Sequence, residues 1–402
     1  MMYLWIASQM NIFFLKVLGL TLLIISTAFC QFDRFYPPDY AVKCPPDTEI
    51  DPCKCNAASG EIECYGNKIN DECLKKVFEK LMAYYANTQE RHIKSLKVYK
   101  SDVTELTGDT LGDISLEILD LNGNQNLTLN NIHRTALSKS KETLRVFRIN
   151  GPSGFSSAKK EENDGSIFEI VDGFMQLMEF SLSEAKILKI QRSAFGRVEL
   201  PKLTRIELPR NEIEELGDYV FYRLPNLTLL NIQDNEIKKL TNYTFAFEKS
   251  ADELLSINLR GNLLQIDTID RGAFTRLNRP VHLNLEYNLI EYLDKDVFSP
   301  ILSNTKSSIK IGRNPIRCDC RMKWLKLDDH NFMDRVDGLI CPEATELWYY
   351  TVDDLEGVCN ETLLAERLAA SRGSTRNAFH LQGLLLFIGF MAITLEIAFY
   401  LC

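Results

Sequence analysis

Cysteine is the residue type whose spacing points most directly to chemistry in this 402-residue sequence. Nine of the 11 cysteines form two groups with no cysteine between them, namely Cys44, Cys53, Cys55, Cys64 and Cys73, then Cys318, Cys320, Cys341 and Cys359. Disulfides are the expected state for a chain that enters the secretory pathway. A zinc site is the alternative, but C-x-C pairs without a matching C-x-x-C or His partner are unusual zinc spacing. We therefore predict disulfides, and the spacing alone leaves their connectivity open.

The first group contains an odd number of cysteines, so one of them has no partner within the group. Cys73 is the candidate, because it lies in an apparent helix rather than in the tight loop that holds the others. Its thiol is predicted either to stay free or to link two copies of the chain as a disulfide-bonded dimer.

Patterns typical of catalysis are missing from the sequence. None of the five histidines is spaced from a cysteine or carboxylate as a metal ligand would be. No G-x-S-x-G, Walker loop or strand-preceded G-x-G-x-x-G occurs, and the carboxylates are scattered. We therefore predict that the chain is not an enzyme and uses no cofactor or metal. The formal net charge of -9 also argues against a nucleic-acid partner.

The elements that carry these groups are indicated by a repeat of about 25 residues. Its pattern is L-x-x-L-x-L-x-x-N-x-h-x-x-h, where h is apolar, with a Phe about ten residues after the Asn. The clearest copies begin at Leu203, Leu227, Leu254 and Pro280. Partial copies begin at Ile93, Leu116, Leu144, Leu177 and Ile309, which makes nine candidate repeats between residues 91 and 316.

Each copy is predicted to form one short strand followed by a return segment. The L-x-L alternation turns two apolar side chains inward, and stacked copies pair their strands into a parallel sheet. The repeated Asn is expected to bond to backbone groups at the turn that leaves the sheet. The phenylalanines are expected to stack as a spine beneath the opposite face, namely Phe195, Phe221, Phe245, Phe274 and Phe298.

Two segments depart from the repeat. Residues 70–85 are predicted to form an amphipathic helix with Leu74, Val77, Phe78, Leu81 and Tyr85 on one face. Asn70 or Asp71 would cap it, and its apolar face would pack on the first repeat. Residues 152–166 are polar and are predicted to form a surface loop, either functional or a tolerated insertion.

The two ends of the chain have targeting features. Residues 17–29 form a short apolar run, and the small residues Ala28 and Cys30 predict cleavage of a signal peptide, 1–30, after Cys30; a membrane anchor is the alternative. Residues 383–402 form an apolar tail behind a polar spacer, which predicts a GPI-anchor signal or a spanning helix. The candidate attachment residues are Ser371, Gly373 and Ser374. Glycosylation sequons occur at Asn126, Asn226, Asn242 and Asn360.

Taken together, these motifs resemble extracellular leucine-rich-repeat proteins with cysteine-rich flanking caps. The N-P-I-R-C-D-C run at 314–320, followed by Trp324, Leu325, Cys341 and Cys359, is similar to the carboxyl-terminal cap. Similarity to the amino-terminal cap rests on Cys44-Pro-Pro, Cys53-x-Cys55 and Cys64. The resemblance implies the disulfides Cys44–Cys55, Cys53–Cys64, Cys318–Cys341 and Cys320–Cys359. The helical insert and the irregular early repeats further resemble arthropod proteins named after the non-catalytic subunit of Oplophorus luciferase.

The predicted fold is an α/β leucine-rich-repeat solenoid, with a curved parallel sheet on its concave face and disulfide-bonded caps. We divide the chain into signal peptide (1–30), amino-terminal cap with helical insert (44–90), repeats (91–316), carboxyl-terminal cap (317–360), spacer (361–382) and hydrophobic tail (383–402).

Binding is the predicted function, because a solenoid offers its concave sheet as a contact surface. The outward position of each L-x-L is polar along the whole array, at Asp120, Arg148, Ser181, Glu207, Asn231, Asn258, Asn284 and Lys310. Such a face suits an extracellular protein or glycan partner better than lipid. We predict a cell-surface recognition or adhesion protein, held to the membrane by its tail. The alternative is a secreted, non-catalytic subunit that stabilises or presents an enzyme.

Overall fold

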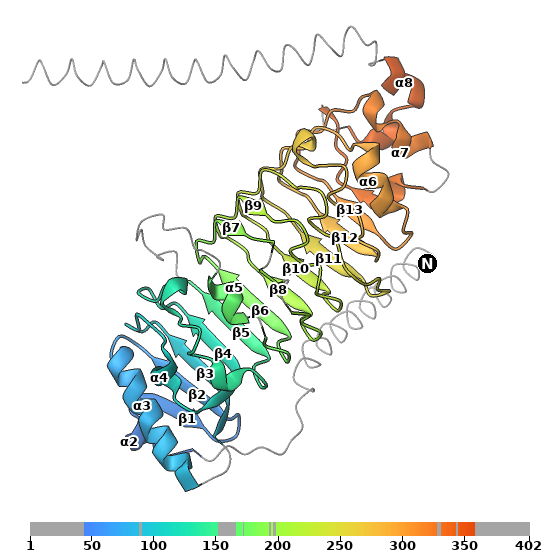
Figure 1. Cartoon of the computed structure of the whole chain (residues 1–402). Helices are drawn as coiled ribbons and strands as arrows, with labels where there is room; N and C mark the ends of the chain where they lie inside the picture. Colours follow the sequence, from blue (N-terminus) through green and yellow to red (C-terminus); the bar gives the residue numbers. More distant parts are fainter. Residues whose placement is uncertain are drawn as a thin grey trace, which may run out of the picture. The chain divides into compact units, whose positions relative to one another are not determined.

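A computed structural model describes residues 44–87, 91–151, 166–171, 173–192, 194–195, 198–327, 331–342 and 345–357 (Figure 1). The chain separates into two compact units, one of residues 1–44 and 56–60 and one of residues 45–55 and 61–402. In the first unit, residues 56–60 form a turn in which the Gly60 amide donates to the Asn56 carbonyl at 2.8 Å. The second unit contains the repeats and the helices.

One sheet of twelve strands runs through this unit in the order β1-β2-β3-β4-β5-β6-β8-β10-β11-β12-β13-β14 (Figure 1). A further pair, β7 (Lys189–Ile190) and β9 (Glu215–Leu216), forms a small second sheet. The strands of the large sheet are β1 (Cys53–Asn56), β2 (Glu61–Tyr65), β3 (His92–Tyr99), β4 (Ser115–Asn122), β5 (Val146–Asn150), β6 (Glu179–Ser183), β8 (Arg205–Glu207), β10 (Leu229–Asn231), β11 (Leu255–Asn258), β12 (Val281–Asn284), β13 (Ser308–Lys310) and β14 (Val336–Asp337).

Each of the nine predicted repeats supplies one strand of the large sheet, from β3 through β6, then β8, and then β10 through β13. Neighbouring strands pair in parallel with equivalent residues opposite each other, for example Leu230 beside Ile206 and Ile257. Almost all apolar residues of the L-x-x-L-x-L copies are buried, because a single strand can hide them only against its neighbours. Leu254, predicted to begin one of the clearest copies, is 39% exposed, and its neighbour Leu255 is buried in its place. The fold is therefore a leucine-rich-repeat solenoid whose curved parallel sheet lies on the concave face.

The caps also contribute strands to this sheet, which the repeat pattern alone did not predict. In the amino-terminal cap, β2 pairs in parallel with β3 and places Ile62 beside Leu96. In the carboxyl-terminal cap, β14 pairs with β13 and places Val336 beside Ile309. Both caps therefore cover the ends of the array by continuing its sheet.

The helices are short apart from α3. They are α2 (Asp47–Ile50), α3 (Asp71–Tyr84), α4 (Gly108–Leu111), α5 (Ser166–Val171), α6 (Lys295–Leu302), α7 (Trp324–Leu327) and α8 (Val352–Gly357). The 3-10 turns are η2 (Tyr85–Asn87), η3 (Leu129–Asn131), η4 (Ser138–Ser140), η5 (Ile266–Thr268), η6 (Cys320–Met322), η7 (Met333–Arg335) and η9 (Leu347–Tyr349). Ser166, which the sequence placed at the end of the surface loop, is the first residue of α5. The helix forms there because the residues directly after Ser166 are mostly apolar and become buried.

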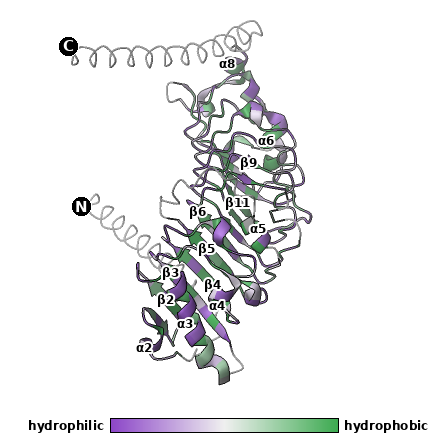
Figure 2. Ribbon diagram, turned by 60° about the vertical axis from the view of Figure 1, so that its left-hand side comes forward, coloured by the Kyte–Doolittle hydropathy of each residue, from purple (hydrophilic) through white to green (hydrophobic). Residues whose placement is uncertain are grey.

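Helix α3 is the predicted amphipathic insert, and Figure 2 shows hydrophilic and hydrophobic residues along it. Its four predicted apolar residues, from Leu74 to Leu81, are buried. The Asn70 side chain caps the helix by accepting a hydrogen bond from the Cys73 amide at 2.8 Å. Asp71 accepts a hydrogen bond from the Thr104 amide at 2.7 Å instead, and so fixes the helix to the loop after β3.

The repeated asparagines connect successive repeats, as the sequence predicted. The Asn235 Nδ2 donates to the carbonyls of Leu208 and Ile232 at 2.9 and 3.0 Å. Its Oδ1 accepts from the amides of Asn211 and Ile213 at 3.1 and 3.2 Å. Asn211, Asn262, Asn288 and Asn314 make the same kind of contacts to two repeats. Asn124 bonds to the Val98 carbonyl and the Ser101 amide of the preceding repeat. These turns are buried, so the amide side chains satisfy backbone groups that water cannot reach.

The phenylalanine spine is also present. Ring centroids of consecutive members lie 5.4–6.3 Å apart from Phe195 to Phe298. Phe180 and Phe168 extend the spine beyond Phe195, at 5.7 and 5.2 Å from its ring. Because all these rings are buried, they hold the return segments at a constant distance from the sheet.

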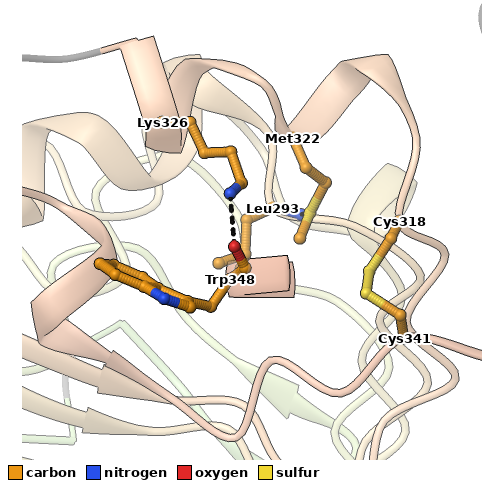
Figure 3. The surroundings of a disulfide bond; sticks show 6 residues. All are labelled: Leu293, Cys318, Met322, Lys326, Cys341 and Trp348. Carbon is orange, nitrogen blue, oxygen red and sulfur yellow. Dashed lines mark hydrogen bonds between the residues drawn. A yellow bond between two sulfur atoms is a disulfide. The ribbon is translucent and has the colours of Figure 1, made fainter. Parts of the chain in front are cut away.

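Disulfides hold both caps. Cys53 is joined to Cys64, and Cys318 to Cys341, two of the pairs implied by the family resemblance. Cys44, Cys55 and Cys320 are disulfide-bonded as well. Figure 3 shows the Cys318–Cys341 bond close to Met322, whose sulfur accepts a hydrogen bond from the Leu293 amide at 3.2 Å.

The carboxyl-terminal cap is fixed to the last repeat by a tryptophan. Trp324 is buried, and its indole nitrogen donates to the Leu293 carbonyl at 2.9 Å. Its ring meets that of Phe332 at 5.6 Å. The tryptophan therefore satisfies a backbone carbonyl of the preceding repeat while its ring covers the apolar end of the array.

Several predicted features lie outside the described residues. They are the signal peptide (1–30), most of the surface loop (152–165), the spacer (361–382), the hydrophobic tail (383–402), and the residues Cys359, Asn360, Ser371, Gly373 and Ser374. Among the helices of the described part, none has both the length and the apolar character needed to cross a bilayer.

Candidate binding face of the sheet

The eight predicted face residues lie side by side in one row across the sheet. Asp120 is opposite Arg148, Arg148 is opposite Ser181, and the register continues unbroken to Lys310. The caps extend the same row, which we call the central row: Glu63, Lys97, Asp120, Arg148, Ser181, Glu207, Asn231, Asn258, Asn284, Lys310 and Asp337.

The sequence missed the ends of this row. Glu63 and Asp337 belong to strands inside the caps, and Lys97 belongs to the first, irregular repeat. The only local signal was in β2, where Ile62 and Cys64 lie two residues apart and point inward. This spacing marks Glu63, between them, as outward.

Central-row side chains point away from the core because a strand alternates its faces. The flanking residues of β4, Leu119 and Leu121, are buried against the return segments. A second outward row lies two residues earlier on each strand and includes Glu61, Glu179 and Arg205. This second row supplies partners for the charged members of the central row.

Ion pairs organise the half of the face formed by β2 to β8. Lys97 pairs with Glu61 at 2.6 Å across two strands. Arg148 donates two hydrogen bonds to Glu179, at 2.6 and 3.0 Å. Two parallel bonds of this kind fix the planes of both groups, and they contribute to the raised pKa of the Arg148 guanidinium.

One more ion pair lies on this half, between Arg205 and Glu207 on β8. All these pairs are at least partly exposed, so their net contribution to stability is small. Their consequence is mainly geometric, because each cation is held next to one particular carboxylate.

Asparagines form the other half of the face, on β10, β11 and β12. Each one accepts a hydrogen bond through Oδ1 from the backbone amide two residues later, for Asn231, Asn258 and Asn284 at 3.2, 3.1 and 2.9 Å. Asn258 also donates to Gln233 at 2.8 Å. The carbonyl oxygens of this ladder therefore close local turns, and its amide groups are the parts that can point toward a partner.

Asp120 is the exception in the charged half. It is 6% exposed, and its Oδ1 has no hydrogen-bond partner. Burial raises its pKa, although the nearby Arg148 and Lys97 act in the opposite direction. Burial, followed by the charges of Asp120, Glu61 and Glu63, raises the pKa of Tyr99 to about 12.

The three described glycosylation sites are exposed and lie off the central row. Asn226 precedes β10, and its Nδ2 donates to the Pro201 carbonyl at 2.7 Å. Asn242 lies in a return segment and accepts from the Gly272 amide at 3.0 Å. Asn126 follows the turn after β4.

Cys73 keeps a free, partly exposed thiol on α3. Within the described ranges, no three His, Cys, Asp or Glu side chains are grouped so that they could hold a metal ion.

The repeat region matches a known family model. The model, described as leucine rich repeat, matches residues 175–237 and 201–264. These segments contain the most regular asparagine and phenylalanine positions. The match agrees with the leucine-rich-repeat fold that the sheet register shows, and it covers residues 175–264.

Comparison with known proteins finds relatives of low identity. A curated relative from Danio rerio, leucine-rich repeat and fibronectin type III domain-containing protein 1, is 26% identical over 111 residues. The match covers 25% of this chain and 19% of that protein, so it spans about a fifth of the relative.

Two solved structures are similar at 18–19% identity, and for each the likeness covers 78% of this chain and 99% of the other. Human 5T4 (Wnt-activated inhibitory factor 1, trophoblast glycoprotein) has a TM-score of 0.42. The octameric complex of latrophilin 3, Unc5D and FLRT2 has a TM-score of 0.45.

Proposed function

We propose that this chain is a non-enzymatic extracellular binding protein that recognises a protein partner through the central row and its flanking side chains. The observation that carries the proposal is the unbroken register of polar outward residues across the sheet. From Asp120 to Lys310, seven inter-strand steps of about 4.8 Å span roughly 34 Å. A face of that length is on the scale of a standard protein–protein interface.

The interior of the repeats makes this face suitable for recognition. Asparagine and phenylalanine columns fix each strand relative to the next, so the outward side chains are held in place before a partner arrives. A preorganised surface loses less conformational entropy on binding. The mixture of ion pairs and amide groups is suited to a polar, hydrated interface with a protein.

The positions of the glycosylation sites are consistent with binding through the central row. Asn126, Asn226 and Asn242 are exposed but are not members of the central row. Glycans on these residues would cover other parts of the surface and leave the central row open to a partner.

A glycan placed on the central row tests the proposal. Gln233→Thr turns Asn231-Ile232-Gln233 into a glycosylation sequon, so one substitution adds a bulky glycan at a defined row position. The full chain would be expressed on insect cells and screened against an arrayed panel of cell-surface and secreted ectodomains. We expect a panel protein that binds the original chain to lose binding to the glycosylated variant.

The matched control is Gln233→Val, which puts a side chain of similar shape at the same position without creating a sequon. This control should retain the partner, which separates the bulk of the glycan from the loss of Gln233. Undiminished binding to the glycosylated variant would place the interface elsewhere and contradict the proposal.

We further propose that the chain reaches the cell surface, with the signal peptide at 1–30 and the tail at 383–402 as its targeting segments. The support is compositional, from the two apolar runs and their flanking residues. Phosphatidylinositol-specific phospholipase should release the protein from expressing cells if the tail directs a GPI anchor at Ser371, Gly373 or Ser374. Retention on the cells after treatment would favour a spanning tail.

A secreted, non-catalytic subunit of an enzyme is the second candidate. The helical insert α3 within the amino-terminal cap is the observation that favours it, because the luciferase-subunit resemblance rests partly on that insert. Purification of the native protein with a stoichiometric catalytic chain would support this second function. A panel partner without enzymatic activity would support the first.

A further inference from the structure

We infer that Asp120 and Ser95 form a docking point for a basic side chain, lysine or arginine, of the protein partner. The inference rests on the proposed function and specifies the chemistry of the partner at one position of the same face. Two neighbouring strands, β3 and β4, supply the two residues.

Two buried oxygens without partners lie on these strands. Four buried side-chain nitrogen or oxygen atoms of the described residues have no hydrogen-bond partner, and two of them are Asp120 Oδ1 and Ser95 Oγ. Ser95 is opposite Ile118, which is two residues from Asp120 on the same face of β4. Both residues are more than nine-tenths buried, so their unpaired oxygens carry a desolvation cost.

The cations beside Asp120 are already engaged. Lys97 and Arg148 flank it in the central row, one on each side. Lys97 is paired with Glu61, and Arg148 is held by two hydrogen bonds to Glu179. Neither of these described cations forms a salt bridge with Asp120.

The charge around Asp120 is therefore unbalanced. Within this group, the two ion pairs cancel, whereas Asp120 and the exposed Glu63 remain without a paired cation. A local excess of negative charge favours an incoming cation.

The hydrogen-bonding capacity of the two unpaired oxygens indicates which kind of cation would bind there. A carboxylate oxygen and a hydroxyl oxygen can each accept a hydrogen bond. An ammonium group has three N–H donors and a guanidinium has five, so one basic side chain carries enough donors for both oxygens. Lys97 is held by one partly exposed ion pair, to Glu61, and can move aside to admit it, whereas Arg148 stays fixed by its two hydrogen bonds to Glu179.

Peptides selected on the chain test this inference even when the natural partner is unidentified. Full-length protein on cells would be used to select dodecapeptides from a random phage library. Each selected peptide would be resynthesised with Arg replaced by citrulline or Lys by acetyl-lysine, which removes the charge with little change of size. We expect one such replacement to weaken binding to the original chain by on the order of tenfold or more.

The same replacement should have little effect on how tightly the peptide binds the Asp120→Asn variant, because that variant lacks the charge that the peptide cation meets. We expect the loss to fall below about twofold, as in a double-mutant cycle between interacting groups. Glu207 lies in the same row and is already paired with Arg205, but it is itself part of the proposed binding face. Glu214→Gln therefore serves as the off-face control: Glu214 is outside the central row and is already paired with Lys238, so this variant should keep the full tenfold dependence on the basic residue.

Asp120→Glu provides a second variant in case Asp120→Asn folds poorly. It retains the charge, so the dependence on the basic side chain should remain. The inference is overturned if neutral peptides dominate the selection, or if charge removal weakens binding equally on the original chain and on Asp120→Asn.

The outcome also separates this inference from the proposed function. Peptides or panel proteins that lose binding to the glycosylated Gln233→Thr variant but ignore Asp120 would leave the binding face standing and remove the docking point. Ligands indifferent to both variants would remove both.

Discussion

The side chain of Asn235 bonds to backbone groups of two successive repeats, and it is buried with them. A residue with this many main-chain contacts has a role that its neighbours on the surface do not share. Asn231 lies four residues earlier and makes one local bond, to the Gln233 amide at 3.2 Å. The two asparagines therefore allow a comparison of the same residue type in two environments.

Asn235→Ala should lower the free energy of unfolding by about 3 kcal/mol, because it leaves several buried backbone groups without partners. Asn231→Ala should lower it by less than about 1 kcal/mol, because its position is partly open to water. Urea unfolding followed by circular dichroism measures both changes. Equal losses in the two variants would contradict the assigned role of the asparagine column.

Asp120 leads to a prediction about pH. Its pKa is raised above the ordinary value of 3.8, and burial is the main cause. The unfolded chain therefore releases this proton more readily than the folded chain. The resulting loss of stability develops as the pH rises from about 3.8 through the folded pKa, and it is fully present above that pKa.

Asp120→Asn removes this charge, so the variant should melt roughly 2 °C above the original chain at pH 7. The advantage should shrink as the pH is lowered and vanish below about 3.8, where both states hold the proton. Scanning calorimetry from pH 7 to pH 4 measures the trend. A constant difference over this range would show that the gain does not come from the carboxylate charge.

At the scale of elements, the phenylalanine spine ties the return segments together. Phe245 lies between Phe221 and Phe274, with ring centroids at 6.0 and 5.4 Å, and it is fully buried. Similar ring contacts continue on both sides, to Phe195 and to Phe298. The spacing of the strands on the concave face therefore depends on these rings.

Phe245→Ala should lower the free energy of unfolding by about 4 kcal/mol, since it removes a large buried ring and leaves a cavity. Leu289→Ala is a suitable control, because Leu289 is 44% exposed and the change should stay within about 0.5 kcal/mol. Chemical denaturation of both variants gives the two values. A small effect at Phe245 would mean that the surrounding rings collapse into the space.

At the scale of the whole molecule, the glycans and the binding face should be independent. Asn126→Gln, Asn226→Gln and Asn242→Gln each remove one exposed sequon outside the central row. Every variant whose site is used should migrate faster on a gel, and glycosidase treatment should abolish the difference. Binding to panel proteins should remain within about twofold of the original, because the central row is unchanged. Loss of a partner on removing one of these glycans would place that glycan in the interface.

Much of the fold could be predicted from the sequence because each repeat carries its own signals. The L-x-L spacing indicates a strand within a few residues, and the asparagine and phenylalanine positions recur in phase. The helix at 70–85 and its Asn70 cap follow from local periodicity in the same way. Such short-range patterns specify local structure independently of distant residues.

The residues of the face could be predicted from the sequence, but the ion pairs that they form could not. Alternation along each strand identified Asp120, Arg148 and Glu207 as outward residues. The partner of Arg148 comes from another strand, since it binds Glu179, 31 residues later, whereas Glu207 pairs with Arg205 on its own strand. Sequence spacing cannot show which cation pairs with which carboxylate, since register and side-chain direction decide it.

The cysteine spacing, the repeat period and the two interior columns were determined by the sequence itself, because these features act between neighbouring copies of one pattern. Only the tertiary structure decided that β2 and β14 of the caps continue the sheet and that the central row extends to Glu63 and Asp337. It also decided that Lys97 and Arg148 are engaged by other carboxylates, which leaves Asp120 buried and unpaired. The physical reason is competition: each cation binds the carboxylate that strand register brings within reach, and that choice exists only once the strands have paired.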